Sequence, residues 1–464
     1  MTTPKPRAAE RAFHPRPARL TPVAAVCAGL LGLPLLAAAQ AAPASDQKLE
    51  TVTVSGFRAS LENSISTKRN ADAIVEAISA EDIGKLPDVS IADAISRLPG
   101  LTAQRVAGRS SVISIRGMAP RFGVTLLNGR EIVSTGDNRS VEYDQFPSEL
   151  INAATVYKTP DPSLSAQGLS GTINMKTLRP LDFSKSQMVV GARLERNSNG
   201  SLNPEISGTG NRLSASWVTQ SADRTFGAAI GFAHLDSPNQ EQHYKSWWWA
   251  NTNNWGAPLP GAPLDAVALQ GFELGAASSR QKRDGLMGVL EYKPGNGFHS
   301  TLDLYYSKFD QTEARRTVMS DMSTWSGAGW TNAQTTDING DKIITSGNVV
   351  NTTPVALTTY NKRQDDIRAI GWNNELKLGD WKLAGDLSLS KAKRDEQNAE
   401  VQAGSRNRVA LNDAHIVTGD GRSTFKPDFD FANPQNVYLT DPANWGRDGR
   451  SQFPKVRDEI KALK

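Results

Sequence analysis

The sequence has almost no cysteine and, after its first 41 residues, no long apolar segment. Cys27 is the single cysteine among 464 residues, so the chain beyond it has no disulfide and no thiolate metal site. The first 41 residues hold five of the 52 Lys and Arg residues and one of the 48 acidic residues, which leaves 47 of each sign. This balance does not indicate a nucleic-acid-binding protein. No later stretch reaches 18 apolar residues, which argues against a transmembrane helix but not against spanning β-strands, because only half of their residues are apolar.

Patterns typical of enzymes and of metal sites are also missing. There is no Walker loop and no GxSxG elbow, and no pair of histidines has the spacing of metal ligands. The segment "DINGDK" places Asp337, Asn339 and Asp341 at part of a calcium-loop spacing, but the remaining ligands are absent and a β-turn is the favoured interpretation. We therefore expect no catalytic site, no metal site and no cofactor.

Residues 1–41 have the order of a secretory signal peptide. Basic residues come first, an apolar run from Val23 to Ala39 follows, and small residues end it. The alternative is an N-terminal membrane anchor, for which a run of about 17 residues is marginal. Residues 42–60 follow as a small, polar spacer with a short β-rich segment, "ETVTV", from Glu50 to Val54.

Residues 61–183 mix short helix and strand patterns and predict a compact α/β domain. Apolar residues at Ile91, Ile95 and Leu98 have helical spacing, and Pro99-Gly100 ends the pattern. Asn128-Gly129 divides a β-rich run and predicts a hairpin turn. The runs "INAATVYKTPDP" and "GLSGTINMKTLRP" are expected to form a further pair of strands.

From residue 184 onward, apolar and small or charged residues alternate with a period of two, which is typical of half-buried strands. In "HSTLDLYYS", for example, Leu302 and Leu304 fall on one face and Asp303 on the other. Tight turns at "SADR", "KPGNG" and Gly379-Asp380 alternate with long polar stretches, about 236–279 and 310–363. Short turns that alternate with long loops favour an outer-membrane barrel over the alternative, a soluble β-sandwich.

In this order, signal, strand-like box, α/β domain and amphipathic hairpins, the chain resembles the TonB-dependent receptors of Gram-negative outer membranes. The resemblance rests on several segments taken together: "TVTVSGFRASLENSISTKRNADAIVEAISAEDIGKLPD", "RLPGL", "ISIRGM", "TLLNGR", "FPSELINAATVYKTPDPSL" and "GLSGTINMKTLRPLDF". It implies an α/β plug domain at 61–183, followed at 184–464 by part of an antiparallel outer-membrane β-barrel with long extracellular loops. The family barrel has 22 strands, of which we count about seven or eight here.

The resemblance implies that the β-rich segment is the TonB box. This box consists of Glu50, Thr51, Val52, Thr53 and Val54. This periplasm-facing segment would pair edge-to-edge with the C-terminal domain of the energy-coupling protein TonB, which the ExbB-ExbD complex energises. The alternative is that these residues form the first strand of the plug.

Two groups of residues are candidates for other roles. By resemblance, Arg116 and Glu149 match plug positions that pair with charges of the barrel wall, although each could equally be an ordinary turn or cap residue. In "KSWWWANTNNW", Trp247, Trp248, Trp249 and Trp255 lie in an expected outward loop. Aromatic faces beside amides suit carbohydrate stacking, and the alternative is a packing cluster or an aromatic girdle at the membrane surface.

The expected function is TonB-coupled uptake of a scarce nutrient, such as a ferric siderophore or an oligosaccharide, through the outer membrane. The last segment, "FPKVRDEIKALK", is charged and helix-leaning, and we expect the chain to be the N-terminal part of a longer receptor. The alternative function is an exported fragment that contains the plug and binds TonB without transport.

Overall fold

In the computed structural model, the described residues are 62, 64–79, 90–106, 108–136, 138–164, 166–253 and 257–464. They form a five-stranded sheet, a nine-stranded sheet, a six-stranded sheet and a two-stranded ribbon. Among these residues, no helix has the length and apolar character needed to cross a membrane. The predicted TonB box lies outside the described residues.

The plug is a mixed α/β unit. Its five-stranded sheet contains, in spatial order, β1 (Val75–Ser79), β6 (Ala153–Tyr157), β7 (Gly171–Lys176), β4 (Gly123–Leu127) and β5 (Arg130–Glu131). Strands β4 and β7 are parallel, and the other pairs are antiparallel. The ribbon consists of β2 (Leu101–Val106) and β3 (Arg109–Ile115), and short 3-10 turns η1 (Pro120–Phe122), η2 (Tyr143–Gln145), η3 (Ser148–Leu150) and η4 (Pro180–Asp182) connect the strands.

Local sequence explains two plug elements. Helix α4 (Ile91–Ile95) begins where the Ser90 hydroxyl accepts a hydrogen bond from the Ala92 amide, a normal N-cap. Both isoleucines are fully buried, as the helical spacing predicted. Asn128 and Gly129 both have positive φ, 53° and 79°, as a two-residue hairpin turn between β4 and β5 requires.

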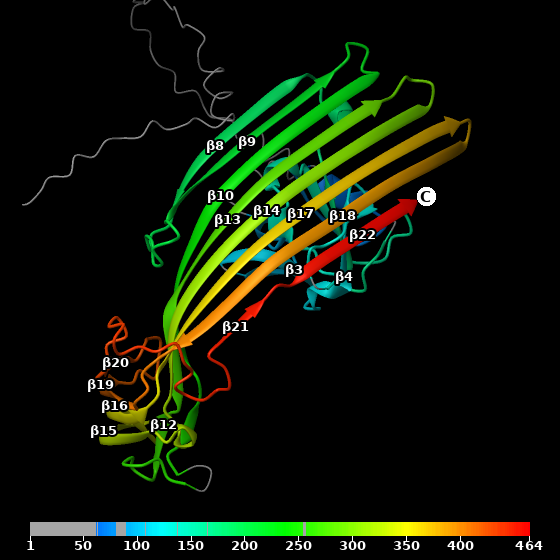
Figure 1. Ribbon diagram of the computed structural model, residues 1–464. Coiled ribbons are helices and arrows are strands. Elements are labelled where there is room, and N and C mark those ends of the chain that lie inside the picture. The colour runs from blue at the N-terminus through cyan, green and yellow to red at the C-terminus, as the bar shows by residue number, and fades with distance from the viewer. Residues whose placement is uncertain are drawn as a thin grey trace, which may run out of the picture. The chain divides into compact units, whose positions relative to one another are not determined.

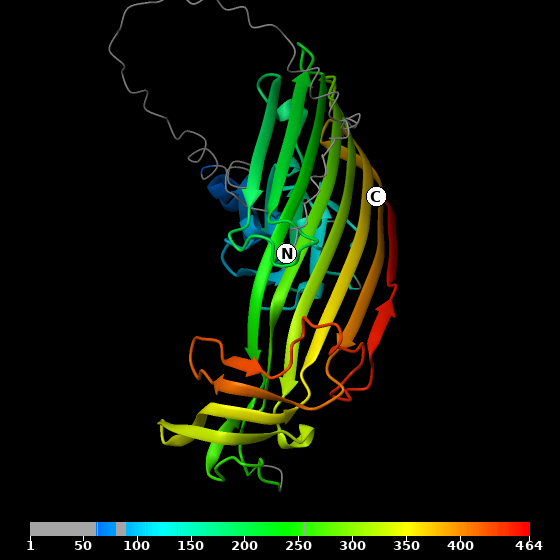
Figure 2. The ribbon, with the colours of Figure 1, turned by 60° about the vertical axis from the view of Figure 1, so that its left-hand side comes forward.

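The nine-stranded sheet is antiparallel and curves around the plug (Figures 1 and 2). Its strands are β8 (Gln187–Arg196), β9 (Thr209–Gln220), β10 (Phe226–Ser246), β13 (Gly271–Tyr292), β14 (Phe298–Asp321), β17 (Val355–Leu378), β18 (Trp381–Ala403), β21 (Gly449–Gln452) and β22 (Lys455–Leu463). Strands β21 and β22 both pair with β18, one after the other along its edge, so the sheet is eight strands wide. The predicted plug followed by an antiparallel sheet is confirmed, and so are the three tight turns.

Two sequence expectations about this sheet are wrong. Strands β10, β13, β14 and β17 extend 21 to 24 residues and take up much of the stretches expected to be loops. Ladder hydrogen bonds satisfy the backbone of these polar segments, so they need no apolar face to remain extended. The helix-leaning C-terminal segment is strand β22, because the edge of β18 supplies a pairing partner and Ile460 packs against the plug core.

A separate small sheet lies at the ends of the long strands away from their tight turns (Figure 1). It contains β11 (Trp249–Asn251), β12 (Ala266–Leu269), β15 (Gly329–Ile338), β16 (Asp341–Thr352), β19 (Val409–His415) and β20 (Thr424–Pro427), and the 3-10 turn η6 (Thr324–Ser326) lies beside it. It has its own apolar core around the fully buried Trp330. Asn339 and Gly340, inside the suspected calcium loop, form the β15–β16 turn with φ of 56° and 93°.

The main core lies between the plug and the inner face of the large sheet. Plug residues such as Phe146 and Leu150 share one cluster with Ala229, Met287 and Tyr305 of the sheet. The rings of Phe146 and Tyr305 stack with centroids 5.4 Å apart. Gly231 and Gly285 on the inner face of the sheet let the plug approach closely, because a Cβ atom there would lie 2.8 Å from Leu150 and 2.3 Å from Pro147.

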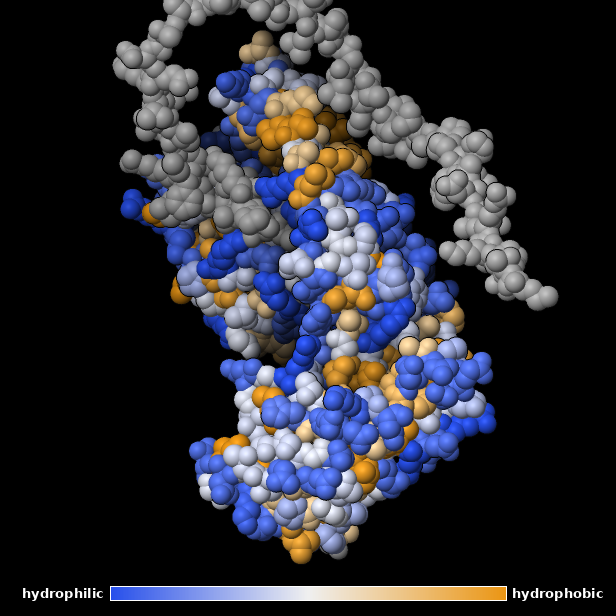
Figure 3. All heavy atoms as spheres, turned by 90° about the vertical axis from the view of Figure 1, so that its left-hand side faces the viewer, coloured by the Kyte–Doolittle hydropathy of each residue, from blue (hydrophilic) through white to orange (hydrophobic). Residues whose placement is uncertain are grey.

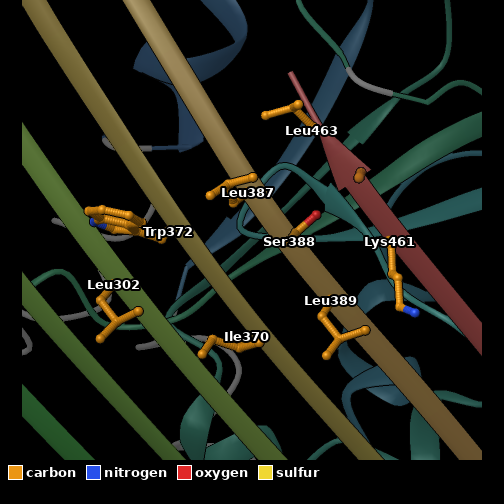
Figure 4. Close-up of a pocket in the computed structure, with 9 residues that line it drawn as sticks. Leu302, Ile370, Trp372, Leu387, Ser388, Leu389, Lys461 and Leu463 are labelled. Atoms are coloured by element: carbon orange, nitrogen blue, oxygen red, sulfur yellow. The ribbon is translucent and has the colours of Figure 1, made fainter.

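The outer face of the large sheet carries exposed apolar side chains. The close-up in Figure 4 shows Leu302, Ile370, Trp372, Leu387 and Leu389 pointing the same way from β14, β17 and β18, where they line an apolar hollow. In the view of Figure 3, large hydrophobic patches lie near the end of the long strands that carries the tight turns, and the opposite end is mainly hydrophilic. An apolar face of this extent is typical of a surface that does not face water.

Candidate functional site: the plug and the inner face of the sheet

Charged side chains of the plug meet opposite charges on the inner face of the large sheet in three clusters. Each cluster joins residues that are more than 60 positions apart in the sequence, so it is a product of the fold. All three lie where the plug contacts strands β9 to β18, and we consider this contact the candidate functional site.

The first cluster surrounds Arg130, which the Asn-Gly hairpin places at the start of β5. Its guanidinium lies 2.6 Å from the carboxylate of Asp303 on β14 and 2.8 Å from that of Asp386 on β18. Arg179, just before η4, lies 2.5 Å from the other oxygen of Asp303. Asp303 also accepts a hydrogen bond from the Asn128 amide. Two guanidinium groups of the plug thus neutralise two carboxylates of the sheet.

The second cluster reverses the charges, with the acid on the plug. Glu142, just before η2, forms ion pairs with Arg363 of β17 and Arg394 of β18. Both arginines also bind Asp365, which is 2% exposed, and the Gln145 amide of the plug donates to the same carboxylate. Burial raises the pKa of Glu142, but the two guanidinium groups outweigh it, so the carboxyl pKa lies below its ordinary value.

The third cluster contains Glu149, at the centre of η3. Its two oxygens lie 3.5 Å from Arg212 of β9 and 3.7 Å from Arg283 of β13. Arg283 is 1% exposed and donates to the main-chain carbonyls of Asp144 and Phe146. The Arg283 guanidinium of the sheet is therefore held by main-chain carbonyls as well as by the Glu149 carboxylate.

Neutral hydrogen bonds fill the space between the clusters. The Ser390 hydroxyl accepts from the Val133 amide, and the Ser307 hydroxyl donates to the Gln145 carbonyl. Each of these polar groups can bind water when the plug and the sheet separate, whereas separation also exposes the apolar cluster around Phe146 and Tyr305. Buried ion pairs add little net stability over apolar packing, but removing one partner is costly. The contact is thus specific in its position and can still be released.

The two predicted latch residues have different positions. Glu149 contacts the wall as described above. Arg116 does not face the wall: it sits in a turn with φ of 53°, is exposed, and donates to the Ser170 carbonyl within the plug at 2.9 Å. Arg116 therefore contacts another part of the plug, because the turn after β3 directs its side chain toward the start of β7.

The tryptophans predicted as substrate-loop residues are divided by the fold. Trp247 and Trp248 stack with centroids 5.8 Å apart, and Trp445 approaches Trp247 at 5.9 Å. Trp249 begins β11 and packs against the core of the small sheet. Trp255 lies outside the described residues. Sequence reasoning missed Trp445, because nothing along the chain connects it with "SWWW".

The edge of the plug sheet has its own charge contact. Glu76 on β1 accepts from Lys68 at 2.7 Å and from Lys158, just after β6, at 3.0 Å. Among the described residues, β1 pairs with β6 and with no other strand. This lysine clamp, which we define as Lys68, Glu76 and Lys158, fastens the first described strand of the plug to its neighbour.

Comparisons with known proteins found one family model and several solved structures. Residues 67–172 match the family model "TonB-dependent Receptor Plug Domain". Solved structures with similar chains include a mutant of the ferric enterobactin receptor PfeA from Pseudomonas aeruginosa, at 12% identity and a TM-score of 0.38 over 78% of this chain and 59% of that one. Others are the siderophore receptor PirA from Acinetobacter baumannii (13%, 0.31, 76% and 62%) and the copper transporter OprC (12%, 0.30, 84% and 62%). The chain covers less than two thirds of each of these structures.

Proposed function

Starting from the TonB-dependent receptor plug domain that this chain carries at residues 67–172, we propose that the protein takes part in TonB-coupled uptake of a small molecule through the outer membrane. The plug closes the passage at the inner face of the sheet, and movement of the plug opens it. TonB supplies the force, and the apolar outer face contacts outer-membrane lipid.

The observation that carries this proposal is the set of three ion-pair clusters between plug and sheet. Beside the apolar cluster around Phe146, the contact buries charges, which costs desolvation energy and adds little stability over further apolar packing. Here opposite charges are matched at Arg130, Glu142 and Glu149, and polar groups surround each of them. The matched charges favour one resting position of the plug, and water can solvate them when the contact opens.

The position of β1 supports the route by which force reaches the plug. The TonB box precedes this strand in the sequence, so tension on residues 50–54 reaches β1 before any other strand of the plug sheet. Within the described part of the chain, β1 is at the sheet edge and has one strand partner, and the lysine clamp also holds it. We infer that extraction of the plug begins at this edge.

The substrate is proposed to be a ferric siderophore or an oligosaccharide. The exposed Trp248 and Trp445 and the stacked Trp247 offer flat aromatic faces at the end of the sheet away from the tight turns, which suits sugar or aryl groups.

Proline substitution in the TonB box tests the function. Val52→Pro and Val54→Pro remove a backbone donor and disfavour strand addition, so uptake by cells should be lost while substrate binding to the cell surface stays intact. Ser45→Pro in the preceding spacer is the matched control and should leave uptake unchanged. Uptake that persists in both valine variants contradicts TonB coupling. Binding of TonB by a chain that never supports uptake favours the alternative, a plug-containing fragment without transport.

A further inference from the structure

The chain contains four Asn-Gly dipeptides, which begin at Asn128, Asn199, Asn296 and Asn339. In this dipeptide the side-chain amide of asparagine lies beside the backbone nitrogen of a residue that has no side chain to shield it. That nitrogen can displace the side-chain amide as ammonia, so an asparagine in this context is chemically labile. The rate in a folded protein depends on how firmly the fold holds the side chain, and the four dipeptides differ in this respect.

Asn128 and Asn339 occupy the same kind of turn. Their φ angles are 53° and 56°, and those of the glycines that follow them are 79° and 93°. Each dipeptide connects two antiparallel strands, β4 with β5 and β15 with β16 (Figure 1). A Cβ atom on either glycine would meet no other atom within 4 Å. The backbone conformation and the space around the glycine are therefore matched, and the two sites differ in the surroundings of the asparagine side chain.

The side chain of Asn128 is held on both of its polar atoms. The Thr177 backbone amide donates to Asn128 Oδ1 at 2.9 Å, and Asn128 Nδ2 donates to the Thr177 hydroxyl at 3.0 Å and to the Asp303 carboxylate at 3.1 Å. Asp303 belongs to the first ion-pair cluster, so the large sheet as well as the plug fixes this amide. The side chain must leave all these partners before the backbone nitrogen of Gly129 can reach its carbonyl carbon.

The side chain of Asn339 has no such restraint. Asn339 is exposed, and within the part of the chain that the structure describes its amide forms no hydrogen bond. Among the described residues, β15 pairs with β16 and with no other strand, and two register shifts interrupt this pairing. Local opening of a hairpin with few neighbours costs little free energy. The turn can therefore relax into the conformation that the reaction needs.

The other two dipeptides are intermediate. Asn199 Nδ2 donates to the Gln240 carbonyl at 3.0 Å. Asn296 Oδ1 accepts from the Phe298 amide at 3.2 Å. Each side chain thus has a partner, but neither has the set of contacts that holds Asn128.

We propose that Asn339 is a site of spontaneous deamidation in the folded protein, and that the fold protects Asn128 from the same reaction. The backbone nitrogen of Gly340 loses its proton and bonds to Asn339 Cγ, and the Cγ–Nδ2 bond breaks with release of ammonia. Water then opens the resulting succinimide ring at one of its two carbonyls, which gives aspartate or isoaspartate. Water is consumed, and the reaction needs no oxidant, reductant or enzyme.

Either product changes the exposed turn of the small sheet. Aspartate adds a negative charge between Asp337 and Asp341 in the sequence. Isoaspartate lengthens the main chain by a carbon atom inside the turn, which disturbs the pairing of Ile338 with Asp341. The modification thus alters the charge and shape of the β15–β16 turn, while the turn that positions Arg130 against the large sheet stays intact.

Peptide mapping by mass spectrometry tests the proposal on the purified full chain in detergent, incubated at neutral pH and physiological temperature. The same incubation in concentrated urea gives the rate of each dipeptide in its own sequence context without the fold. The ratio of the unfolded to the folded rate measures the protection at each site. This ratio should be within about twofold of unity at Asn339 and about tenfold or more at Asn128, with Asn199 and Asn296 between them. In Asn339→Gln the mass gain of this peptide should disappear, which assigns it to position 339 and not to the nearby Asn332.

Three outcomes overturn the proposal. The first is an unmodified Asn339 in the folded chain after an incubation that converts this residue in urea. The second is equal protection of Asn339 and Asn128. The third is an Asn128 that reacts in the folded chain as fast as in urea, because the contacts with Thr177 and Asp303 then give no protection. The measurement involves neither substrate nor TonB, so its result is independent of the TonB-box experiment.

Discussion

The guanidinium of Arg130 lies 2.6 Å from the carboxylate of Asp303, a residue 173 positions later in the chain. The contact is possible because Gly371 on the neighbouring strand has no side chain: a Cβ atom there would lie 2.4 Å from the Arg130 guanidinium carbon. The position of the Arg130 charge thus depends on three features. These are the hairpin turn at 128–129, a glycine in the sheet and a carboxylate on the inner face of β14. The position of the plug against the sheet is defined by such contacts.

Arg130→Met should loosen the plug, because it leaves Asp386 without its ion-pair partner in a buried site. Removing one partner of a buried pair costs about 3–5 kcal/mol, and Arg179 still neutralises part of the charge on Asp303. At the lower end of this range, hydrogen exchange of the β4 and β5 amides should accelerate by about a hundredfold. Mass spectrometry of the chain in detergent measures this exchange. Arg121→Met, at a plug arginine remote from the wall, should not change it, and equal exchange in the two variants contradicts the latch.

Gly285→Leu should displace the plug by steric contact. A Cβ atom at this inner-face position of β13 would lie 2.3 Å from a ring carbon of Pro147. Gly288 is the matched control, since a Cβ atom there meets Leu304 of the outer face at 3.7 Å, an ordinary contact. Overpacking of this kind costs about 1–3 kcal/mol. Proteolysis of the plug should therefore be faster in Gly285→Leu than in Gly288→Leu, and Pro147→Ala should partly restore resistance. Equal proteolysis rates in the two leucine variants show that the plug does not rest on this surface.

Acid should release β1 from the plug sheet. Burial raises the pKa of Glu76, but hydrogen bonds from Lys68 and Lys158 outweigh it, so its folded-state pKa lies below the ordinary value of 4.5. A carboxyl group with a lowered pKa contributes stability above its unfolded pKa and loses this contribution as the pH falls through the folded one. The protection factors of the β1 amides, which correct for the intrinsic pH dependence of exchange, should fall below about pH 4. In Glu76→Gln the protection factors should be lower at neutral pH and nearly independent of pH in this range. A pH dependence that survives the substitution assigns the effect to another group.

The sequence predicted the parts of this fold that depend on local pattern. The period of two placed Asp303 and Asp386 on the face opposite to the leucines, which is the face that meets the plug. The Asn-Gly dipeptide predicted the hairpin that carries Arg130. Pairing partners across the chain were not predictable: neither the contact of Glu149 with Arg212 and Arg283 nor that of Trp247 with Trp445 has a signal in the residues themselves. The strand at 455–463 was missed because its support comes from distant parts of the chain, the edge of β18 and the cluster against which Ile460 packs, and this support overrides a helical preference.

The outer face of the sheet allows one further test, which asks whether lipid or water surrounds the long strands. Leu387 projects outward from β18 beside Trp372 and is 47% exposed (Figure 4). If lipid covers this face, Leu387→Arg places a charge in the hydrocarbon region at a cost of about 2–4 kcal/mol near its middle. The urea-resistant fraction after refolding with phospholipid vesicles should then fall. Lys391→Arg is the control, because Lys391 lies on the same face of the same strand, already carries a charge, and pairs with Glu459 at 2.6 Å. The two residues are four positions apart, so they occupy different depths of one surface. A loss confined to Leu387→Arg supports a lipid contact of the leucines, whereas an unchanged urea-resistant fraction in Leu387→Arg means that water, not lipid, covers them.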